Sequence, residues 1–461
     1  MIAIPRALAR RFRVLAPKCV VGRPRGPAPA VVVRRARGRV TLAAAFPDAA
    51  LELSGPGPGS AEVLVIPMAV LDAIGGPEPE PVRLEPTGPG TGTARWTERG
   101  ASRSVPVEFL VPGEHHNPLP HPADPAPVGA AFRAALHGAG RVTSRADGRY
   151  ALSRVQVRGG AGQVVGTDGT VAVVFDGFAL PFPGDVLVPA LALFGCPEVR
   201  AETDVRVGRT AAHLVVSLGD VTVWLGLTAG LKFPDVSGAI PQSARTTVTL
   251  DARDAADLLA ALPGLRGGTE EHRPVTLDAD RVLTVRARAA GTNTARDLVL
   301  ARSPVAGPAA RVALNRRALG TMLGLGCGAL RLGPDRPVAA SGPGVTVLAA
   351  ALGPDFVAPP TEPEIRPEPS GAGDIILALD ERSDPMTPRA PARPEPAPGH
   401  PAPPPSDPPD PLVAAEDLRA ALGDAAAKAA RLVAALRAGR KEKKVLASVW
   451  AGLKNLNLGA R

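Results

Sequence analysis

The side chains best suited to bind a metal ion belong to Glu114, His115, His116 and His121, which cluster in a Pro-rich segment. Imidazole and carboxylate groups at such spacing can hold a zinc ion. A Pro-rich composition is also typical of a connector between folded parts, and this interpretation is preferred. No metal site is therefore predicted.

Other candidate catalytic groups lack the context that chemistry requires. The run Gly88-Pro-Gly-Thr-Gly-Thr has the composition of a phosphate loop, but no lysine follows it and no strand-to-helix pattern surrounds it, so it predicts a turn. Glu270 and Glu271 fall in a polar loop, and no Ser/His/Asp order with a supporting motif occurs. The sequence predicts neither an enzyme nor a cofactor.

Composition indicates a β-rich protein with several cores. The 461 residues suggest about three domains, and 45% of them are hydrophobic. Gly and Pro are abundant, but alternating runs such as 155–175 favour strands. Tyr150 is the only tyrosine, which argues against an aromatic platform for single-stranded nucleic acid. Cys19, Cys196 and Cys327 lie far apart, so a reducing cytoplasm is expected.

The charge balance permits a nucleic-acid partner. The formal net charge is +9, from 53 Lys and Arg against 44 Asp and Glu. Arg6, Arg10, Arg11 and Arg13 precede the first acidic residue and are open to interpretation as a transit peptide, but a helix is preferred there. No apolar run approaches the roughly 20 residues of a membrane span, so no membrane association is predicted.

Two segments near the C-terminus differ in composition from the rest. The Pro-rich stretch from Ala358 to Pro411 cannot build a core and predicts a linker. Beyond it, Val413 to Leu458 carries apolar residues at helical spacing and predicts an αα-hairpin or a coiled-coil partner. Its basic cluster, Arg437 to Lys444, is either a solvated turn of a partner-binding hairpin, which is favoured, or a nucleic-acid contact.

The first 356 residues contain an internal repeat with a period near 120. Four elements recur in order: a helix, a strand that ends in a turn, a short helix and a second strand. The helices are predicted at 4–16, 128–138 and 252–262, and the turn-ending strands begin at Val40, Val164 and Val282. The short helices start at Pro67, Pro189 and Asn315, and the later strands begin at Val82, Val205 and Leu330. Each unit therefore predicts an α+β fold of two helices on one face of an antiparallel sheet.

The middle repeat carries the most specific motifs. These are Gly148-Arg149-Tyr150-Ala-Leu152, Val165-Gly-Thr167-Asp168-Gly169, Val188-Pro189, Leu231-Lys-Phe-Pro-Asp235 and Ile240-Pro241. The first repeat adds Gly22-Arg23-Pro24, and the third adds Leu314-Asn315. In this order and spacing the motifs resemble the bacterial DNA polymerase III beta subunit, the β sliding clamp. The resemblance implies clamp domains at 1–117, 118–241 and 242–356, then a disordered linker at 357–412 and a helical tail at 413–461.

The resemblance implies a head-to-tail homodimer that closes as a ring around duplex DNA. Arginines on inner helices would attract phosphates without reading sequence. The expected partners are double-stranded DNA, a second copy of the chain, and a DNA polymerase, clamp loader or repair protein. The DNA-binding residues implied by the family motifs or by position on the helices are Arg23, Arg149, Tyr150, Arg6, Arg10, Arg133 and Arg317.

The resemblance also implies a groove between the second and third domains that receives partner peptides. Its expected residues are Leu152, Thr167, Gly169, Thr170, Val171, Pro241 and Asn315. Thr170 and Val171 depart from the basic or His-Arg pair usual in the family, and 347–352 replaces its Met-Pro ending. Pro106, in the expected edge strand of the first domain, removes one donor from pairing across a dimer seam.

Two functions remain open at this point. The first is a clamp that tethers a polymerase or repair factor to DNA and performs no chemistry. The second is a diverged paralogue that acts as a protein-interaction scaffold, with the tail recruiting its partner.

Overall fold

The structure is a computed structural model that describes residues 1–22, 26–78, 80–113, 117–144, 150–241, 243–265, 273–288, 295–333 and 337–359. All of these described residues belong to one compact unit, Met1–Glu368. The predicted tail, nearly all of the predicted linker, and residues 114–116 of the candidate metal cluster lie outside the described residues.

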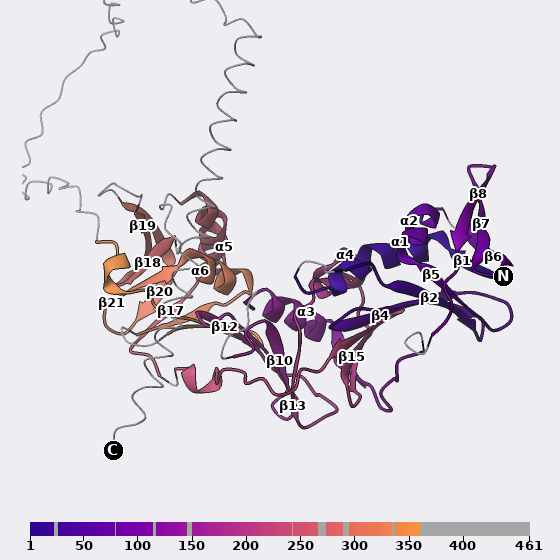
Figure 1. The fold of residues 1–461 in the computed structure, drawn as a ribbon. Coiled ribbons are helices and arrows are strands. Elements are labelled where there is room, and N and C mark those ends of the chain that lie inside the picture. The colour runs from indigo at the N-terminus through magenta and orange to yellow at the C-terminus, as the bar shows by residue number, and fades with distance from the viewer. Residues whose placement is uncertain are drawn as a thin grey trace, which may run out of the picture. The chain divides into compact units, whose positions relative to one another are not determined.

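Each of the three repeats forms two sets of four antiparallel strands (Figure 1). In the first repeat the sets are β1-β6-β7-β8 and β5-β2-β3-β4. Their bounds are β1 Ile2–Pro5, β2 Ala30–Ala36, β3 Arg39–Ala45, β4 Ala49–Pro56, β5 Glu62–Pro67, β6 Pro81–Gly88, β7 Thr91–Glu98 and β8 Ala101–Glu108.

The second repeat has the sets β9-β14-β15-β16 and β13-β10-β11-β12. Their bounds are β9 Ala126–Pro127, β10 Arg154–Arg158, β11 Gln163–Thr167, β12 Val171–Phe175, β13 Asp185–Pro189, β14 Val205–Arg209, β15 His213–Leu218 and β16 Val221–Gly226.

The third repeat has the sets β17-β22-β23-β24 and β21-β18-β19-β20. Their bounds are β17 Thr246–Thr249, β18 Pro274–Ala279, β19 Val282–Arg288, β20 Ala295–Ala306, β21 Ala310–Asn315, β22 Ala329–Leu332, β23 Val338–Gly342 and β24 Val345–Ala349. The strands predicted from Val40, Val164, Val282, Val82, Val205 and Leu330 are all confirmed.

The helices of the described residues follow the predicted repeat with one exception. They are α1 Arg6–Leu15, α2 Met68–Ile74, α3 Gly129–Gly140, α4 Pro197–Arg200, α5 Ala252–Ala261 and α6 Arg316–Gly324, with 3₁₀ turns η1 Ala16–Cys19, η3 Ala192–Gly195, η4 Ser237–Ala239, η5 Leu262–Gly264 and η6 Pro354–Phe356. The prediction of one short helix entered at Pro189 is wrong, because Pro189 ends β13 and the helical segment is split into η3 and α4. A second proline, Pro197, restarts the chain as α4.

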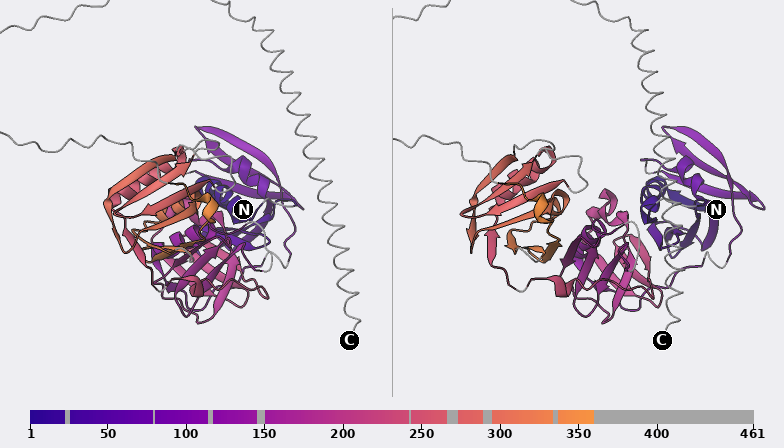
Figure 2. Two further views of the ribbon diagram at one scale, coloured as in Figure 1. Left: turned by 90° about the vertical axis from the view of Figure 1, so that its left-hand side faces the viewer. Right: turned by 60° about the vertical axis from the view of Figure 1, so that its left-hand side comes forward.

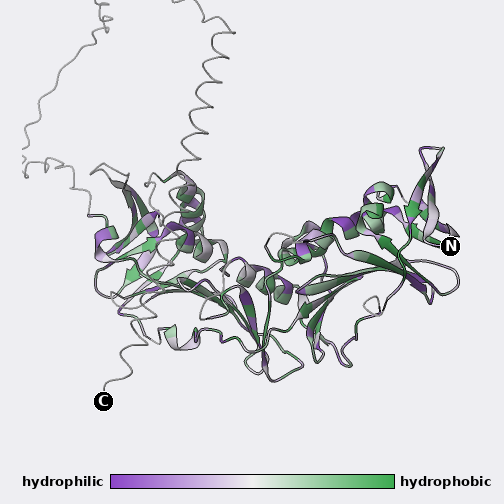
Figure 3. Ribbon diagram, viewed as in Figure 1, coloured by the Kyte–Doolittle hydropathy of each residue, from purple (hydrophilic) through white to green (hydrophobic). Residues whose placement is uncertain are grey.

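Amphipathic spacing and capping explain the longer helices. In α1, Leu8, Phe12 and Leu15 are buried on one stripe, and Figure 3 shows hydrophilic and hydrophobic residues interspersed along its ribbon. The side chain of Asn315 accepts a hydrogen bond from the Arg317 N–H and so caps α6, as its residue type predicts. No helix among these residues has the length and apolar character needed to cross a bilayer.

Adjacent repeats are joined by continuous antiparallel strand pairing. At the first junction β4 pairs with β16 over five residues, Ala49–Leu53 with Leu225–Val221. At the second junction β12 pairs with β24 over five residues, Val171–Phe175 with Ala349–Val345. β4 and β12 are each the third strand, in chain order, of the sets β2–β5 and β10–β13, and β16 and β24 are each the last strand of the following repeat. The two junctions therefore have the same design.

Arginines add polar contacts at both junctions. At the first, Arg11 of α1 donates to the Asp220 carboxylate at 2.7 Å, and Arg154 donates to Asp48 at 3.0 Å. At the second, Arg317 of α6 donates to the carbonyl of Arg141 at 3.1 Å. These contacts supplement the strand pairing.

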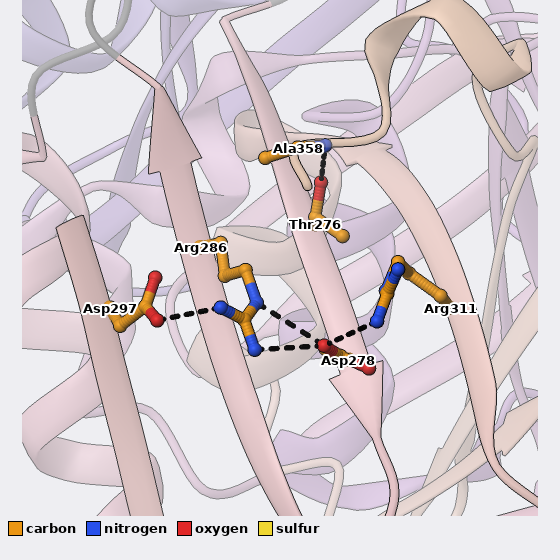
Figure 4. A network of polar contacts seen from close by, with 6 residues as sticks. All are labelled: Thr276, Asp278, Arg286, Asp297, Arg311 and Ala358. Atoms are coloured by element: carbon orange, nitrogen blue, oxygen red, sulfur yellow. Dashed lines mark hydrogen bonds and ion pairs between the residues drawn. The ribbon is translucent and has the colours of Figure 1, made fainter. Parts of the chain in front are cut away.

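A network of charged side chains connects the strands β21, β18, β19 and β20 of the third repeat (Figure 4). Arg286 of β19 donates to Asp278 of β18 at 2.9 Å and to Asp297 of β20 at 2.7 Å. Arg311 of β21 donates to the same Asp278 oxygen at 3.1 Å. Two arginines and two aspartates, one on each strand, thus connect four neighbouring strands and help to fix the position of β20.

The hairpin of β7 and β8 extends past the other strands of its set (Figures 1 and 2). The turn that leads into it is Pro89-Gly90, with Gly90 at φ +71°, which confirms the turn predicted for the glycine-rich run. Strand β8 is the last in its order, as predicted for the strand that contains Pro106. Its outer edge has no strand partner among the described residues.

Candidate nucleic-acid interface

Exposed basic side chains lie on or beside the helices of all three repeats. They are Arg10 and Arg13 of α1, Lys18 of η1, Arg141 after α3, Arg200 of α4, Arg253 of α5 and Arg317 of α6. The exposed acidic residues on the described helices and 3₁₀ turns are Asp72 of α2, which pairs with Arg13 at 3.3 Å, Asp257 of α5 and Asp355 of η6. Basic groups therefore outnumber acidic ones on the helices, and such a surface attracts the phosphates of a nucleic acid whatever its base sequence.

Two of the arginines predicted to face DNA are buried instead. The Arg6 side chain is 4% exposed and donates to Glu78 at 2.7 Å and to Glu98 at 2.9 Å. It also donates to the Ile74 carbonyl and stacks 5.5 Å from the centre of the Trp96 ring. The hydrogen bond from Arg6 lowers the pKa of the Glu98 carboxyl. The prediction for Arg6 is wrong, because its guanidinium is used inside the first repeat.

Arg133 of the second repeat is also buried and bonded inside the protein. It is 8% exposed and donates to the Phe194 carbonyl at 2.7 Å. Arg316, in the third repeat, is also buried and donates to the Leu265 carbonyl. Burial lowers the pKa of both guanidinium groups. Each repeat thus contains one buried arginine that satisfies a carbonyl near the end of a companion helical segment, which sequence spacing alone did not distinguish from a surface arginine.

The different roles of Arg6 and Arg10 predict different stabilities for their alanine variants. Arg6→Ala is expected to lower the free energy of unfolding by roughly 2–4 kcal/mol, because it opens a cavity beside Trp96 and leaves the buried Ile74 carbonyl without its donor. Arg10→Ala, the matched control on the exposed side of the same helix, is expected to change it by less than about 0.5 kcal/mol. Urea unfolding followed by circular dichroism measures both. Equal stabilities of the two variants would contradict the assignment of Arg6 to the interior.

The remaining predicted DNA residues fall into two groups. Arg10, Arg317 and Tyr150 are described and reach the surface, with Arg317 also bonded to the Arg141 carbonyl. The segment around Tyr150 is held by the Ala151 N–H, which donates to the Lys232 carbonyl at 2.9 Å. Arg23 and Arg149 lie outside the described residues. Sequence reasoning missed Arg141 and Arg253, which could have been found as basic residues beside the predicted helix ends.

Five of the seven predicted groove residues, Leu152, Thr167, Gly169, Thr170 and Val171, lie at the turn between β11 and β12. The Asp168 carboxylate accepts hydrogen bonds from the Thr170 and Val171 N–H groups at 2.8 Å, so the turn is internally satisfied. Gly169 has φ +92°, and the position a Cβ would take there is 3.7 Å from Leu152. The Ala350 N–H donates to the Thr170 carbonyl, which brings the segment after β24 against this turn.

The other groove residues have structural roles in this arrangement. Thr167 is buried and donates its hydroxyl hydrogen to the Val171 carbonyl at 2.7 Å. Pro241 is buried, and its carbonyl accepts a hydrogen bond from Arg331 at 3.3 Å. Asn315 caps α6, and the nearby Ala313 carbonyl accepts from the Leu352 N–H. The structure therefore brings Leu152, Gly169 and Thr170 together with Ala350, while the contacts of Asn315 and Pro241 are with other residues.

The described residues offer no evident catalytic centre. Burial raises the pKa of the Cys19 thiol to about 12 and that of Cys327 to about 11, and it raises the pKa of Cys196. A thiol in this state is a poor nucleophile. No group of three or more metal-ligating side chains occurs in the described part of the chain.

Comparisons with known proteins identify the architecture. No family model matches the sequence, and no curated protein does so either. The DNA polymerase sliding clamp of Pseudomonas aeruginosa is 16% identical, with a TM-score of 0.61 over 77% of this chain and 100% of that chain. The beta sliding clamp of C. crescentus is 18% identical, with a TM-score of 0.61 over 76% and 99%. A putative DNA polymerase III beta subunit from Eubacterium rectale is 13% identical, with a TM-score of 0.62 over 76% and 98%. The three repeats therefore have the fold of the bacterial DNA polymerase III beta subunits, the β sliding clamps.

Proposed function

We propose that the chain is a divergent, non-catalytic DNA sliding clamp that closes around duplex DNA as a two-chain ring in the cytoplasm. The ring would tether a polymerase or repair factor to the DNA. The observation that carries this proposal is the common design of the two repeat junctions, in which β4 pairs with β16 and β12 pairs with β24. The comparisons support the fold on which the proposal rests.

The same junction design predicts where a third junction forms. The equivalent strands still lacking this partner are β20, the third strand of its set, and β8, the last strand of the first repeat. On the side away from β19, β17 pairs only with Val305 and Ala306 of β20. The part of this edge of β20 from Leu298 to Ala301 has no strand partner among the described residues. A contact between β20 of one chain and β8 of another is heterologous, and contacts of this kind form a ring when the rotation between the chains closes.

The internal junctions also indicate which part of β8 forms the seam. In β16 and β24 the pairing begins at the first residue of the strand and covers five positions. The equivalent segment of β8 is Ala101 to Val105. Pro106 falls just beyond it, so the missing donor of Pro106 does not interrupt the proposed seam.

Retention of DNA follows from ring closure and from the basic helices. Arg10, Arg253 and Arg317 are exposed on helices of the first and third repeats, and Arg141 follows the helix of the second. Contacts of this kind with phosphates are independent of sequence, which suits a protein that must slide. Arg23, Arg149 and Tyr150 are proposed as DNA contacts on the resemblance alone. The proposed peptide groove consists of Leu152, Thr167, Gly169, Thr170, Val171, Pro241 and Asn315.

Topology provides the test of this function. The chain is loaded onto a nicked circular plasmid, with a bacterial clamp loader present, and then passed through a gel-filtration column in moderate salt. We expect it to stay with the circle and to be lost when a restriction enzyme linearises the same DNA. Equal retention on circular and linear DNA would indicate adhesion by charge and would contradict encirclement.

A protein-interaction scaffold is the second candidate, and one observation favours it. The exposed positions of α3, such as Ala131 and Ala134, carry no basic side chain, and Arg133 is buried. The second repeat thus offers less charge to a duplex than the first. A scaffold would show no difference between circular and linear DNA in the same assay.

A further inference from the structure

A cavity of about 260 Å³ lies on the face of β2, β3 and β4 opposite the main core, at the first repeat junction. Its floor is made of alanines at paired positions: Ala45 lies opposite Ala50, and Ala50 lies opposite Trp224 of β16. Ala43 continues the floor opposite Val32. Because alanine side chains end at Cβ, this run of small residues leaves room between the sheet and the segment 117–119 above it.

The corresponding face at the second junction is filled. There Ala172 lies opposite Leu348, in the positions equivalent to Ala50 and Trp224. Valines occupy the neighbouring positions, and Phe233, Val236 and Ile240 pack on this face from the connector. At the first junction Leu119 is the one partly buried hydrophobic residue, among those described, that packs on the cluster of Ala50, Val215 and Trp224. The cavity is therefore a feature of the first junction, created by smaller side chains and a less apolar connector.

The Trp224 side chain, which forms the aromatic wall of the cavity, is fixed by two contacts within the protein. The Trp224 indole N–H donates to the Pro120 carbonyl at 3.0 Å. The His121 ring packs edge-on against the Trp224 ring, with the ring centres 5.1 Å apart. A wall fixed in this way loses little side-chain freedom when an apolar group packs against it, which favours binding.

One charged group of the lining, the Glu52 carboxylate, has no direct partner among the residues that the structure describes. The Glu52 side chain is half-buried, and no hydrogen bond or ion pair reaches its carboxylate from the described residues. Burial raises the pKa of Glu52 even though His121 and Arg34 act in the opposite direction through their charges. Negative charge at this position is thus incompletely compensated, and a further cationic donor would stabilise it.

We propose that this cavity is a docking site for an extended peptide segment of a partner protein, in which an apolar side chain stands next to a lysine or arginine. The apolar side chain would occupy the alanine floor against Trp224, and the basic group would donate to Glu52. The site goes beyond the proposed clamp function, because it lies on the strand face opposite the main core and at a different junction from the groove around Gly169.

Selection from a random peptide library tests the proposal. Eight-residue peptides displayed on phage are selected on the immobilised full-length chain, and the recovered sequences are synthesised with a fluorescent label. We expect them to share an apolar residue within two positions of a lysine or arginine. Their dissociation constants, measured by fluorescence anisotropy, should rise at least tenfold for Ala50→Leu, which fills the floor, and for Glu52→Gln, which removes the charge.

Two controls make the outcome decisive. Asp204→Asn removes an exposed carboxylate outside the cavity and should leave peptide binding unchanged. Thermal unfolding of each variant confirms that it is folded. Failure to enrich any peptide, recovery of peptides without a basic residue, or equal binding by all variants would overturn the proposal. Retention on circular DNA should be unchanged in Ala50→Leu and Glu52→Gln, so failure of this site and failure of the clamp function are distinguishable.

Discussion

Replacing Ser104 by proline is expected to break the proposed ring into single chains. The Phe109 N–H of the β7–β8 hairpin donates to the Gly90 carbonyl, toward β7. Because donors alternate along an antiparallel strand, the N–H groups of Ser102 and Ser104 point to the free edge of β8. Ser104→Pro removes one of these seam donors without affecting the pairing of β8 with β7.

The effect is large because a two-chain ring contains the seam twice. An unsatisfied carbonyl at each seam costs about 1–3 kcal/mol, so the two seams together lose about 2–6 kcal/mol. This corresponds to a rise of roughly 30-fold to 10⁴-fold in the dimer dissociation constant, measured by analytical ultracentrifugation. Ser104→Ala keeps the backbone donor and serves as the first control. Pro106→Ala lies beyond the proposed seam and should also leave the dimer intact. A dimer unaffected by Ser104→Pro would place the interface elsewhere.

Removing the basic groups of the helices is expected to weaken DNA binding and its dependence on salt. The variant Arg10→Ala, Arg253→Ala, Arg317→Ala loses three exposed charges per chain and six per ring. If each contacts a phosphate, the slope of the logarithm of the binding constant against the logarithm of the salt concentration falls by about five. Binding at low salt should weaken tenfold or more. Anisotropy titrations of a labelled duplex at several salt concentrations give both quantities.

The matched control removes the same charge from the strands. Arg83, Arg209 and Arg281 are exposed on or between strands, so their triple alanine variant should bind DNA with a nearly unchanged slope. Equal slopes for the two triple variants would mean that only net charge matters. That result would remove the helices from the proposed interface.

The fold was largely predictable because its repeat is written in local patterns. Alternating strands at Val40, Val164 and Val282 recur at similar spacing, and Asn315 marks its helix start by residue type. The split of the second short helix was not predictable, because Pro189 serves equally well as a helix entry or as the end of a strand. Its outcome depends on β13 pairing with β10, a contact between distant residues.

The candidate site was predictable only in part, because the partners of a buried arginine lie far from it along the chain. Arg6, Arg10 and Arg133 look alike in the sequence, since each is a basic residue in a helix with apolar neighbours. Whether an arginine is buried depends on partners far along the chain, such as Glu78, Glu98 and the carbonyl of Phe194. Helical spacing contains no information about these partners.

Electron microscopy of the purified full-length protein is the direct test of whether two chains close into a ring. Class averages of negatively stained particles should show closed rings of two chains, with an opening wide enough for a DNA duplex of roughly 20 Å diameter. In the Ser104→Pro variant the rings should be replaced by open single chains. Particles of the wild-type protein that are only single chains, or dimers joined without a central opening, would contradict ring closure.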